Sequence, residues 1–257
     1  MKRLLLIALI SLVPILSFGQ NDGVLKFLGI PIDGAESQFA TKLRSKGFTY
    51  NSYTESYKGQ FNGKYVDIYI HTNHNVVDRV YVAFPPTTEE NIRIEFNLLL
   101  SQFKKNSKYM DLSMNEGIPE TEDISYEINV NNKRYQASFS YFDPDRDPLS
   151  FANALIDKFD GLLPAESISK WKESMATSLN LSEDDQKLQS EHMMTEFQDA
   201  IGNIDEDKAF LFIATFIDGM KSLADGDVWF MIHENYGCYN LGLYYDNLHN
   251  RANGEDL

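Results

Sequence analysis

Residues 228–245, VWFMIHENYGCYNLGLYY, decide the fold because their pattern is typical of two strands around a tight turn. With Tyr236 and Gly237 as the turn, apolar residues on one side of the first strand meet apolar residues on the second. The opposed pairs are Val228 with Tyr245, Phe230 with Leu243, and Ile232 with Leu241. This agreement predicts a β-hairpin over Val228–Glu234 and Tyr239–Tyr245 with one face in the protein core.

The second face of this hairpin is the most informative place for function. Its residues are Trp229, Met231 and His233 on the first strand and Asn240, Gly242 and Tyr244 on the second. A hairpin without a plainly polar face is either covered on both sides or exposes one face to something else. In the first interpretation, helices cover one face and the rest of the chain covers the other. In the second, Trp229 and Tyr244 anchor a binding surface beside Met231 and His233, and Gly242 leaves a shallow dip for a partner side chain.

Two further hairpins are expected earlier in the chain. Alternation of apolar and polar residues over 66–71 and 80–84 predicts one of them. Tyr126–Val130 and Tyr135–Tyr141 predict the other, since a two-residue turn between them would place apolar pairs on one face.

Helices are predicted around these hairpins. One covers about 35–46 and ends at Gly47, where a left-handed helix end belongs. Another covers about 89–104, is capped by Thr87, and carries one apolar stripe.

The second part of the chain has a mostly helical pattern. Aspartates and prolines over 143–148 mark a lobe boundary. Helices are expected at about 151–160, 165–178, 183–201 and 206–224. The fold class is therefore α+β, with antiparallel β hairpins packed with helices in two lobes. The expected parts are a signal peptide over 1–19, an N-terminal α+β lobe over 20–143, and a helix-rich C-terminal lobe over 144–257 that ends in the hairpin.

The N-terminus has the features of a cleaved secretory signal peptide. Two basic residues precede an apolar run over 4–18, and Ser17 and Gly19 supply the small residues of a cleavage site. A membrane anchor is disfavoured, because Pro14 interrupts a run that is shorter than the roughly 20 residues of a span. We expect a periplasmic or extracellular protein that carries no lipid anchor, since no cysteine lies near the cleavage site.

Charge limits the partners. The chain has 23 basic and 38 acidic side chains, a net charge of −15, and removal of the first 19 residues leaves 21 against 38, a net charge of −17. Nucleic acid and anionic lipid are thereby disfavoured, whereas a protein partner or a second copy of the chain remains open. Cys238 is the single cysteine, so the fold must rely on its hydrophobic core and not on disulfides.

Several features could carry metal chemistry, and each has a plainer interpretation. Residues 143–147 place acids as a calcium loop does, but Pro148 and Ala154 stand where an EF-hand needs Gly and Glu. His71 and His74 are three apart and would point to opposite faces of a strand.

Catalytic motifs are also missing from the sequence. His192 falls on the polar side of an expected helix, and Cys238 lacks the surroundings that activate a thiol. Neither a nucleophile elbow, nor a zinc-protease helix, nor a phosphate-binding glycine loop is present. The sequence therefore predicts no catalytic residue, no metal and no cofactor, and it favours a protein without enzymatic activity.

Several turns, caps and strands together carry a family resemblance. They are Leu28–Gly34, Ile124–Glu127, Asn131–Tyr135, Val228–Phe230 and Tyr244–Asn247. These segments resemble an uncharacterised family of exported proteins from Gram-negative bacteria that has no agreed activity. The resemblance implies export and an α+β fold, and it transfers no catalytic residue. A looser similarity, at the level of fold, exists to layered domains of the β-lactamase-inhibitor type.

The leading hypothesis is an exported, non-enzymatic binding protein of unknown ligand that uses the second face of the last hairpin. One alternative is an envelope hydrolase with an unrecognised carboxylate-based or His-based site. Another is a structural protein that forms homo-oligomers. A deep pocket with paired acids or a His–acid pair would favour the hydrolase, and a flat apolar surface would count against it.

Overall fold

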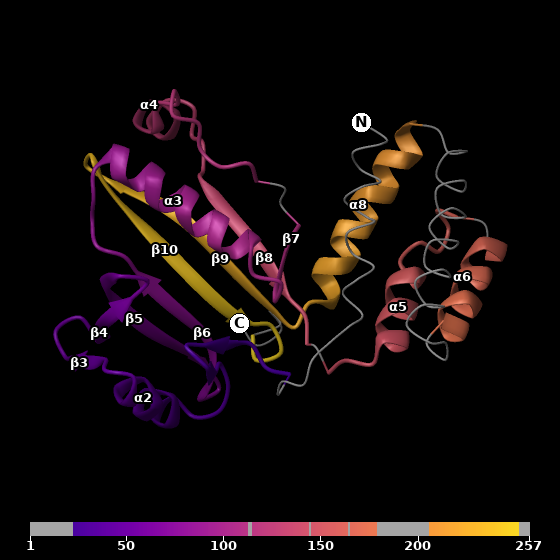
Figure 1. The fold of residues 1–257 in the computed structure, drawn as a ribbon, viewed down its shortest axis with the longest axis horizontal. Helices are drawn as coiled ribbons and strands as arrows, with labels where there is room; N and C mark the ends of the chain where they lie inside the picture. The colour runs from indigo at the N-terminus through magenta and orange to yellow at the C-terminus, as the bar shows by residue number, and fades with distance from the viewer. Residues whose placement is uncertain (1–22, 113–114, 144, 164, 179–205, 252–257) are drawn as a thin grey trace. The chain divides into compact units, whose positions relative to one another are not determined.

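One antiparallel sheet dominates the structure. A computed structural model describes residues 23–112, 115–143, 145–163, 165–178 and 206–251. The sheet has eight strands in the order β3-β4-β5-β6-β10-β9-β8-β7 (Figure 1). Their bounds are β3 Thr49–Asn51, β4 Ser56–Phe61, β5 Lys64–Asn73, β6 Val76–Ala83, β7 Tyr109–Asp111, β8 Gln136–Tyr141, β9 Gly226–Asn235 and β10 Cys238–Asn247. A separate two-stranded ribbon consists of β1 Lys26–Phe27 and β2 Ile30–Pro31. The predicted α+β class is confirmed.

The final hairpin forms in the predicted register. The pairs are Val228 with Tyr245, Phe230 with Leu243, and Ile232 with Leu241. Tyr236 and Gly237 form the turn, with φ of 51° and 79°. The predicted β5–β6 hairpin is also confirmed. His74 and Asn75 form its turn, with φ of 48° and 65°. Two successive residues with positive φ are typical of the tight turns that match the twist of paired strands.

The order of elements occurs twice along the chain. Helix α2 (Glu36–Ser45) precedes strands β3 to β6, and helix α3 (Glu89–Lys104) precedes strands β7 to β10. In each set an edge strand of three residues comes first and a long hairpin comes last. The last strands of the two sets, β6 and β10, pair with each other at the centre of the sheet. The sheet is therefore built from two α-β-β-β-β halves, and the sequence shows no repeat that would have revealed them.

Both helices pack on the same face of the sheet. The stripe predicted for α3 is buried, namely Ile92, Phe96, Leu99, Leu100 and Phe103. Phe39 and Leu43 of α2 belong to the same continuous core. Phe96 and Phe103 pack against Phe230 of β9, with ring centroids 5.0 and 6.0 Å apart. Burial of each such ring contributes about 1.5–3 kcal/mol, which holds α3 on the sheet.

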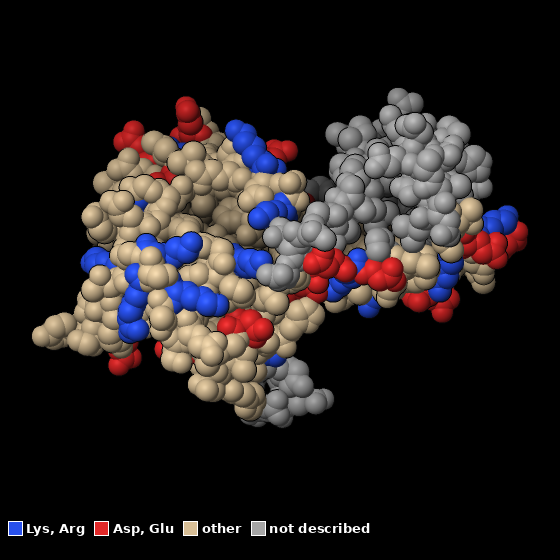
Figure 2. All heavy atoms as spheres, turned by 60° about the horizontal axis from the view of Figure 1, so that its bottom comes forward, with Lys and Arg blue, Asp and Glu red and all other residues tan. Residues whose placement is uncertain are grey.

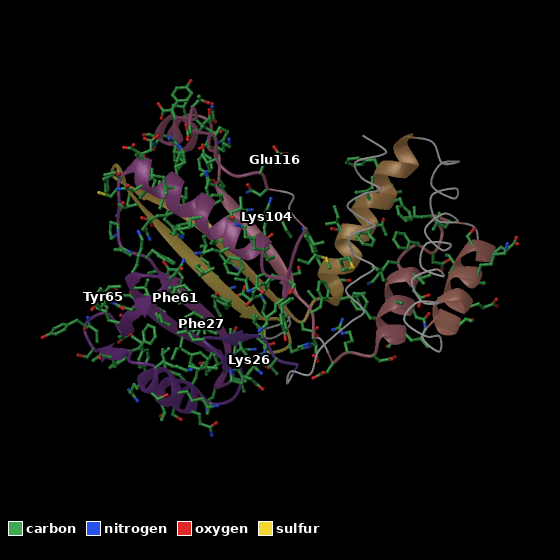
Figure 3. The ribbon with its side chains drawn as sticks, in the orientation of Figure 1. Lys26, Phe27, Phe61, Tyr65, Lys104 and Glu116 are labelled. Carbon is green, nitrogen blue, oxygen red and sulfur yellow. The ribbon has the colours of Figure 1, made fainter. Side chains whose placement is uncertain are left out.

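The small ribbon connects the two halves. The ring of Phe27 of β1 lies near that of Phe61 of the first half (Figure 3), with centroids 5.4 Å apart. The ring centroid of Tyr245 in the second half is 5.2 Å from that of Phe27. Because one buried ring contacts both halves, the ribbon stabilises their union.

The ends of α2 and α3 show where capping was predicted well and where it was not. Gly47 adopts the expected left-handed conformation, with a φ of 94°. Its N–H donates to the carbonyl of Arg44 at 2.9 Å, and that of Phe48 donates to Leu43 at 3.4 Å, as in a Schellman motif. At the start of α3 the cap is Thr88 and not Thr87. Thr87 instead exchanges two backbone hydrogen bonds with Tyr239 of β10. These bonds hold Thr87 against the end of the sheet, so it cannot cap the helix.

The hairpin predicted over 126–130 and 135–141 is wrong in its first strand. Ile124–Asn129 form helix α4, and the Asp123 carboxylate caps it by accepting from the N–H of Tyr126 at 2.8 Å. Strand β8 forms as expected, but it pairs with β7 and β9. A run of five alternating residues is too short to separate a strand from a helix, so the capping aspartate decides.

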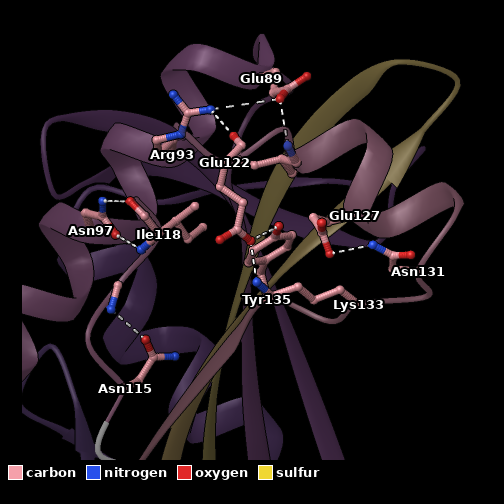
Figure 4. A network of polar contacts seen from close by, with 12 residues as sticks. Glu89, Arg93, Asn97, Asn115, Ile118, Glu122, Glu127, Asn131, Lys133 and Tyr135 are labelled. Carbon is pink, nitrogen blue, oxygen red and sulfur yellow. Dashed lines mark hydrogen bonds and ion pairs between the residues drawn. The ribbon is translucent and has the colours of Figure 1, made fainter. Parts of the chain in front are cut away.

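Glu122 fastens the segment around α4 to the rest of the sheet unit (Figure 4). Its carboxylate accepts from Lys133 and from the Tyr135 hydroxyl, and its carbonyl accepts from Arg93 of α3 at 2.6 Å. The Glu89 carboxylate accepts from the N–H of Ile124 at 2.8 Å. The hydrogen bond from Lys133, supported by the one from Tyr135, lowers the pKa of Glu122, so the carboxylate stays ionised.

Between β8 and β9 the chain forms a second compact unit, residues 144–223. The described helices of this unit are α5 Pro148–Asp157, α6 Ala165–Ser178 and α8 Glu206–Leu223. Helix α5 packs against both α6 and α8, and the rings of Phe159 and Phe212 stack at 4.3 Å. The helix predicted over 183–201 lies outside the described residues. In the described part of the chain, no helix has the length and hydropathy needed to cross a bilayer.

The final hairpin belongs to the sheet and not, as expected, to the helix-rich lobe over 144–257. Its strands pair with β6 and β8, which places 224–257 in one unit with 24–143. The points where the chain leaves and re-enters this unit are adjacent. The N–H of Asp143 donates to Asp225 Oδ2 at 2.6 Å, and the N–H of Asp225 donates to the Tyr141 carbonyl at 2.9 Å. The helical unit is thus an insertion between two neighbouring strands.

Candidate functional site

The face of the sheet that turns away from α2 and α3 is called the open face here. Because side chains alternate along a strand, its members are the residues between the core positions. On the four central strands they are Asp67, Tyr69, His71, Arg79, Tyr81, Ala83, Asp227, Trp229, Met231, His233, Asn240, Gly242, Tyr244 and Asp246. Most of these residues are half-buried or exposed. The uncovered face of an antiparallel sheet is ordinarily polar. The aromatic residues on the open face of this sheet are therefore unusual and call for an explanation.

Four aromatic residues form a stacked ladder across this face. Tyr69, Tyr81, Tyr244 and Trp229 lie directly opposite one another on β5, β6, β10 and β9. The ring centroids are 5.5 Å apart for Tyr69 and Tyr81 and 4.5 Å apart for Tyr81 and Tyr244. Trp229 and Tyr244 are closest, at 3.8 Å with 7° between their planes. All four residues are half-buried, so part of each side chain reaches the surface.

Both halves of the sheet are needed to build this ladder. The first hairpin supplies the pair Tyr69 and Tyr81, and the last hairpin supplies the pair Trp229 and Tyr244. The pairing of β6 with β10 then sets Tyr81 directly opposite Tyr244. A shift of register by one residue would turn one pair into the core, so the ladder depends on the central strand pairing.

Arg79 and Asp246 form an ion pair beside the ladder. Arg79 donates through Nε and Nη2 to the two oxygens of the Asp246 carboxylate, at 2.5 and 2.8 Å. The indole N–H of Trp229 donates to the same carboxylate at 3.0 Å. The guanidinium carbon lies 5.9 Å from the Trp229 ring centroid and 5.8 Å from that of Tyr244. The hydrogen bond to Asp246 raises the pKa of Arg79, so its charge is permanent.

Gly242 provides no dip for a partner side chain, contrary to the expectation from the sequence. A Cβ at this position would lie 2.7 Å from His233 Nε2 and 3.0 Å from a ring carbon of Tyr81. These two side chains therefore already occupy the space above the glycine. His233 Nε2 also lies 3.3 Å from the Tyr244 hydroxyl.

Burial sets the protonation of this cluster. It lowers the pKa of His233, so the imidazole is neutral at neutral pH. It also raises the pKa of Tyr81 to about 12, with Tyr244 adding to the shift, and it raises the pKa of Tyr244. The middle of the open face is therefore aromatic and uncharged. Its phenol hydroxyls are already engaged, because Tyr81 and Tyr244 share a hydrogen bond and Tyr244 also lies beside His233.

A row of charged groups lies along one side of the ladder. It contains Asp78, Asp227 and Asp246 against the single Arg79, together with His71. Asp78, beside the bulge of β6, lies 2.6 Å from His71 Nδ1, and Asp227 accepts from Ser140 at 3.0 Å. Carboxylates outnumber guanidinium groups in this row, which makes this side of the open face acidic.

Basic side chains gather near α2, away from the open face. Lys and Arg side chains gather on the side that carries α2 (Figure 2). Lys42, Arg44 and Lys46 near the end of that helix are exposed. Cations at the C-terminal end of a helix interact favourably with its dipole, which explains why these three residues lie there.

The five binding residues predicted from the sequence lie together on the open face. Trp229 and Tyr244 stack, His233 lies over Gly242, and Met231 is opposite Gly242 on the neighbouring strand. Sequence reasoning missed Tyr69, Tyr81, Arg79 and Asp246. The alternation of the first hairpin contained the signal for the two tyrosines, but the pairing of β6 with β10 that brings them to the site has no mark in the sequence.

The histidines form two pairs with buried carboxylates. His71 pairs with Asp78, and His249 Nε2 lies 2.7 Å from Asp225. The imidazoles are exposed, whereas the carboxylates are 8% and 5% exposed. A buried carboxylate can orient a histidine as a general base. Neither pair, however, lines the surface depression at the turn end of the last hairpin.

A shallow depression of about 640 Å³ lies at the turn end of the last hairpin. Its walls are Pro86, Thr87, Thr88, Glu89, Ser125, Gly237, Cys238 and Tyr239. Cys238 is exposed at the start of β10. The lining holds a single carboxylate, so it is not the deep, paired-acid pocket that would favour a hydrolase.

The remaining sequence candidates have structural roles or lie elsewhere. Asp147 caps α5 by accepting from the N–H of Ser150 at 2.9 Å, and Asp143 binds Asp225 through its N–H. His192 lies outside the described residues. Among the residues that are described, no three histidine, cysteine or acidic side chains cluster as metal ligands would.

Comparison with protein-family models, with curated proteins and with solved structures finds no match for this chain. Its function must therefore be inferred from the open face itself.

Proposed function

We propose that this chain is an exported, non-enzymatic binding protein that docks a protein partner on its open face. The observation that carries the proposal is the ladder of Tyr69, Tyr81, Tyr244 and Trp229, which runs half-exposed across the centre of the sheet. Tyr and Trp are the residues that anchor protein interfaces, because they bury a large area with little loss of side-chain freedom.

The way the rings stack favours a protein over a carbohydrate. Sugars bind to exposed ring faces, whereas neighbouring rings in the ladder cover each other's faces. What remains in the middle of the ladder is a flat row of ring edges and phenol hydroxyls. Such a row can pack flat against the apolar side chains of a protein partner.

The alternatives receive less support from the described residues. A hydrolase needs a reacting group beside its acid or base, and the His–Asp pairs are exposed and apart from the depression. A symmetric homo-oligomer needs a self-complementary interface. Two copies of the acidic row facing each other would repel. A sedimentation experiment on the full chain at micromolar concentration separates this last alternative, since the proposal expects a monomer.

The proposal is tested by capture from native envelope and secreted fractions on the immobilised chain. The informative variant is Tyr69→Thr, because Tyr69 is an end of the ladder and threonine suits a strand. The matched control is Tyr50→Thr, which removes a 45% exposed tyrosine from β3, beside Tyr57 on the other face. We expect a discrete protein that the control captures and Tyr69→Thr loses, with equal thermal midpoints. Equal capture by both variants would contradict the proposal.

A further inference from the structure

The stacked ladder has the geometry of a path for electrons. The ring centroids are 3.8 Å apart for Trp229 and Tyr244, 4.5 Å for Tyr244 and Tyr81, and 5.5 Å for Tyr81 and Tyr69. The planes of successive rings differ by 7°, 14° and 21°, so their π systems face one another. Indole and phenol are among the side chains that lose one electron most readily. An electron can therefore pass between neighbouring rings that are already in contact.

Tyr244 also has a place for its proton, which a phenol releases when it loses an electron. Its hydroxyl lies 3.3 Å from His233 Nε2. Burial raises the pKa of Tyr81 and of Tyr244, and the hydrogen bond between them adds to the rise for Tyr81 but opposes it for Tyr244. This is the pattern expected when Tyr81 donates and Tyr244 accepts, which leaves the hydrogen of Tyr244 for His233. Because burial lowers the pKa of His233, its imidazole is neutral and can accept that proton.

The surrounding charges make Trp229 a poor place for a radical to stay. Oxidised indole is at first a cation, and the guanidinium carbon of Arg79 lies 5.9 Å from the Trp229 ring centroid. The Asp246 carboxylate accepts from the indole N–H at 3.0 Å, but Arg79 donates to both oxygens of that carboxylate and offsets its charge. A tyrosyl radical that has given its proton to His233 is neutral, so Arg79 does not destabilise it. The radical should therefore move from Trp229 to Tyr244.

We propose that the ladder conducts one-electron oxidation, and that the hydrogen-bonded pair of Tyr244 and His233 is the site where the radical rests. The co-reactant is a small oxidising radical that reaches the half-buried Trp229. It takes one electron from Trp229 and becomes an anion. Tyr244 then returns one electron to Trp229 and passes its phenol proton to His233 Nε2. The products are the reduced oxidant, intact Trp229, a neutral tyrosyl radical and an imidazolium, so the electron and the proton are both accounted for.

The test uses the azide radical, generated by a pulse of ionising radiation, because it oxidises indole faster than phenol. The chain has two tryptophans, so Trp171→Phe leaves Trp229 as the only one. In this single-tryptophan chain we expect the visible absorption of the tryptophanyl radical to decay while the tyrosyl band grows at the same rate. That rate should not depend on protein concentration. A rate that rises with protein concentration, or no growth of the tyrosyl band, would contradict the proposal.

A substitution at Tyr244 locates the acceptor. Tyr244→Phe in the single-tryptophan chain keeps the stacked ring and removes the hydroxyl. We expect the tryptophanyl radical to last at least about ten times longer, because the nearest phenol is then one ring further along the ladder. Tyr50→Phe, which alters a 45% exposed tyrosine outside the ladder, is the matched control and should leave the decay unchanged.

A substitution at His233 separates a proton acceptor from a structural neighbour. His233→Gln can still hydrogen-bond the Tyr244 hydroxyl but cannot take its proton, so we expect the transfer to slow by about tenfold. Heavy water should slow the transfer in the single-tryptophan chain, since a proton moves with the electron, and should have less effect in His233→Gln. Unchanged decay in both Tyr244→Phe and His233→Gln would overturn the proposal. The measurement on the single-tryptophan chain decides the question even if either variant fails to fold.

The relay goes beyond the proposed function and does not rest on it. Protein docking uses the surface of the ladder, whereas the relay uses its ring contacts and one proton acceptor. Capture that depends on Tyr69 would leave the proposed function standing if no transfer to Tyr244 is seen. Transfer to Tyr244 in a chain that captures no protein would support the relay alone.

Discussion

Tyr244 shows how much of this molecule depends on single side chains. Its ring stacks on Trp229 and Tyr81, and its hydroxyl lies 3.3 Å from His233. A residue with these contacts is part of the scaffold as well as the surface. Replacing it would disturb stability and binding together, which is why an end of the ladder is a better place for a test.

His233 makes stability depend on pH. Burial lowers its pKa in the folded state below the ordinary 6.5, so the unfolded chain binds a proton first as the pH falls. The stability linked to this residue is complete above about pH 6.5 and is lost as the pH falls through its folded pKa. We expect His233→Gln to lose less stability than the parent chain between about pH 7.5 and about pH 5, as measured by urea unfolding. If both chains lost the same free energy of unfolding over this range, the assignment to His233 would be contradicted. Between about pH 7.5 and 8.5 we expect the stability of both chains to change equally with pH.

At the scale of residues, the sequence contained half of the site. The alternation of the last hairpin brought Trp229, Met231, His233, Gly242 and Tyr244 to one face, because residues two apart on a strand share a side. It could not show that His233 lies over Gly242, since that depends on side-chain rotation. Nor could it show that Tyr81 meets Tyr244, since these residues are 163 positions apart in the chain.

At the scale of elements, strong local signals were predicted and contacts between distant segments were not. The last hairpin, the first hairpin and helix α3 each carry their own pattern over eight residues or more. Helix α4 has six residues, and the alternation of Tyr126–Val130 fits a strand equally well. The decisive groups were Asp123, which caps the helix, and Glu122, whose partners come from other segments.

Glu122 should therefore control how firmly the segment around α4 is held. Glu122→Gln removes the charge that Lys133 and Tyr135 donate to, and we expect a loss of about 1 kcal/mol, kept small because Lys133 is partly exposed. Hydrogen exchange over 115–135 should become faster than in the exposed control Glu120→Gln. The lowered pKa of Glu122 gives stability above about pH 4.5 that is lost as the pH falls, so the variant should show a shallower acid slope. Identical exchange in the two variants would show that Glu122 does not fasten this segment.

At the scale of the whole molecule, the sheet unit is continuous in space although its sequence is interrupted. Asp143 and Asp225 are joined by a hydrogen bond of 2.6 Å where the helical unit leaves and returns. The sequence predicted a boundary at residue 143, but it could not reveal that the last hairpin returns across it. Strand pairing between segments so distant leaves no local pattern.

Removing the helical unit should leave the sheet intact. A chain in which a short glycine linker replaces residues 144–223 is expected to unfold cooperatively and to keep the near-ultraviolet signal of the stacked ladder, because both ends of the insertion are adjacent. Circular dichroism during thermal unfolding measures both properties. A non-cooperative transition or a lost aromatic signal would mean that the sheet requires the inserted helices.

The central claim is that the open face meets a protein partner, and site-specific photo-crosslinking tests it most directly. A photoreactive amino acid is placed at Gln136 or Gln60, which are exposed on the open face, or at Thr41 on the outer side of α2 as a control. In native envelope or secreted material, the account predicts one discrete adduct from both open-face positions and none from Thr41. Adducts from Thr41 alone, or from all three positions equally, would contradict it.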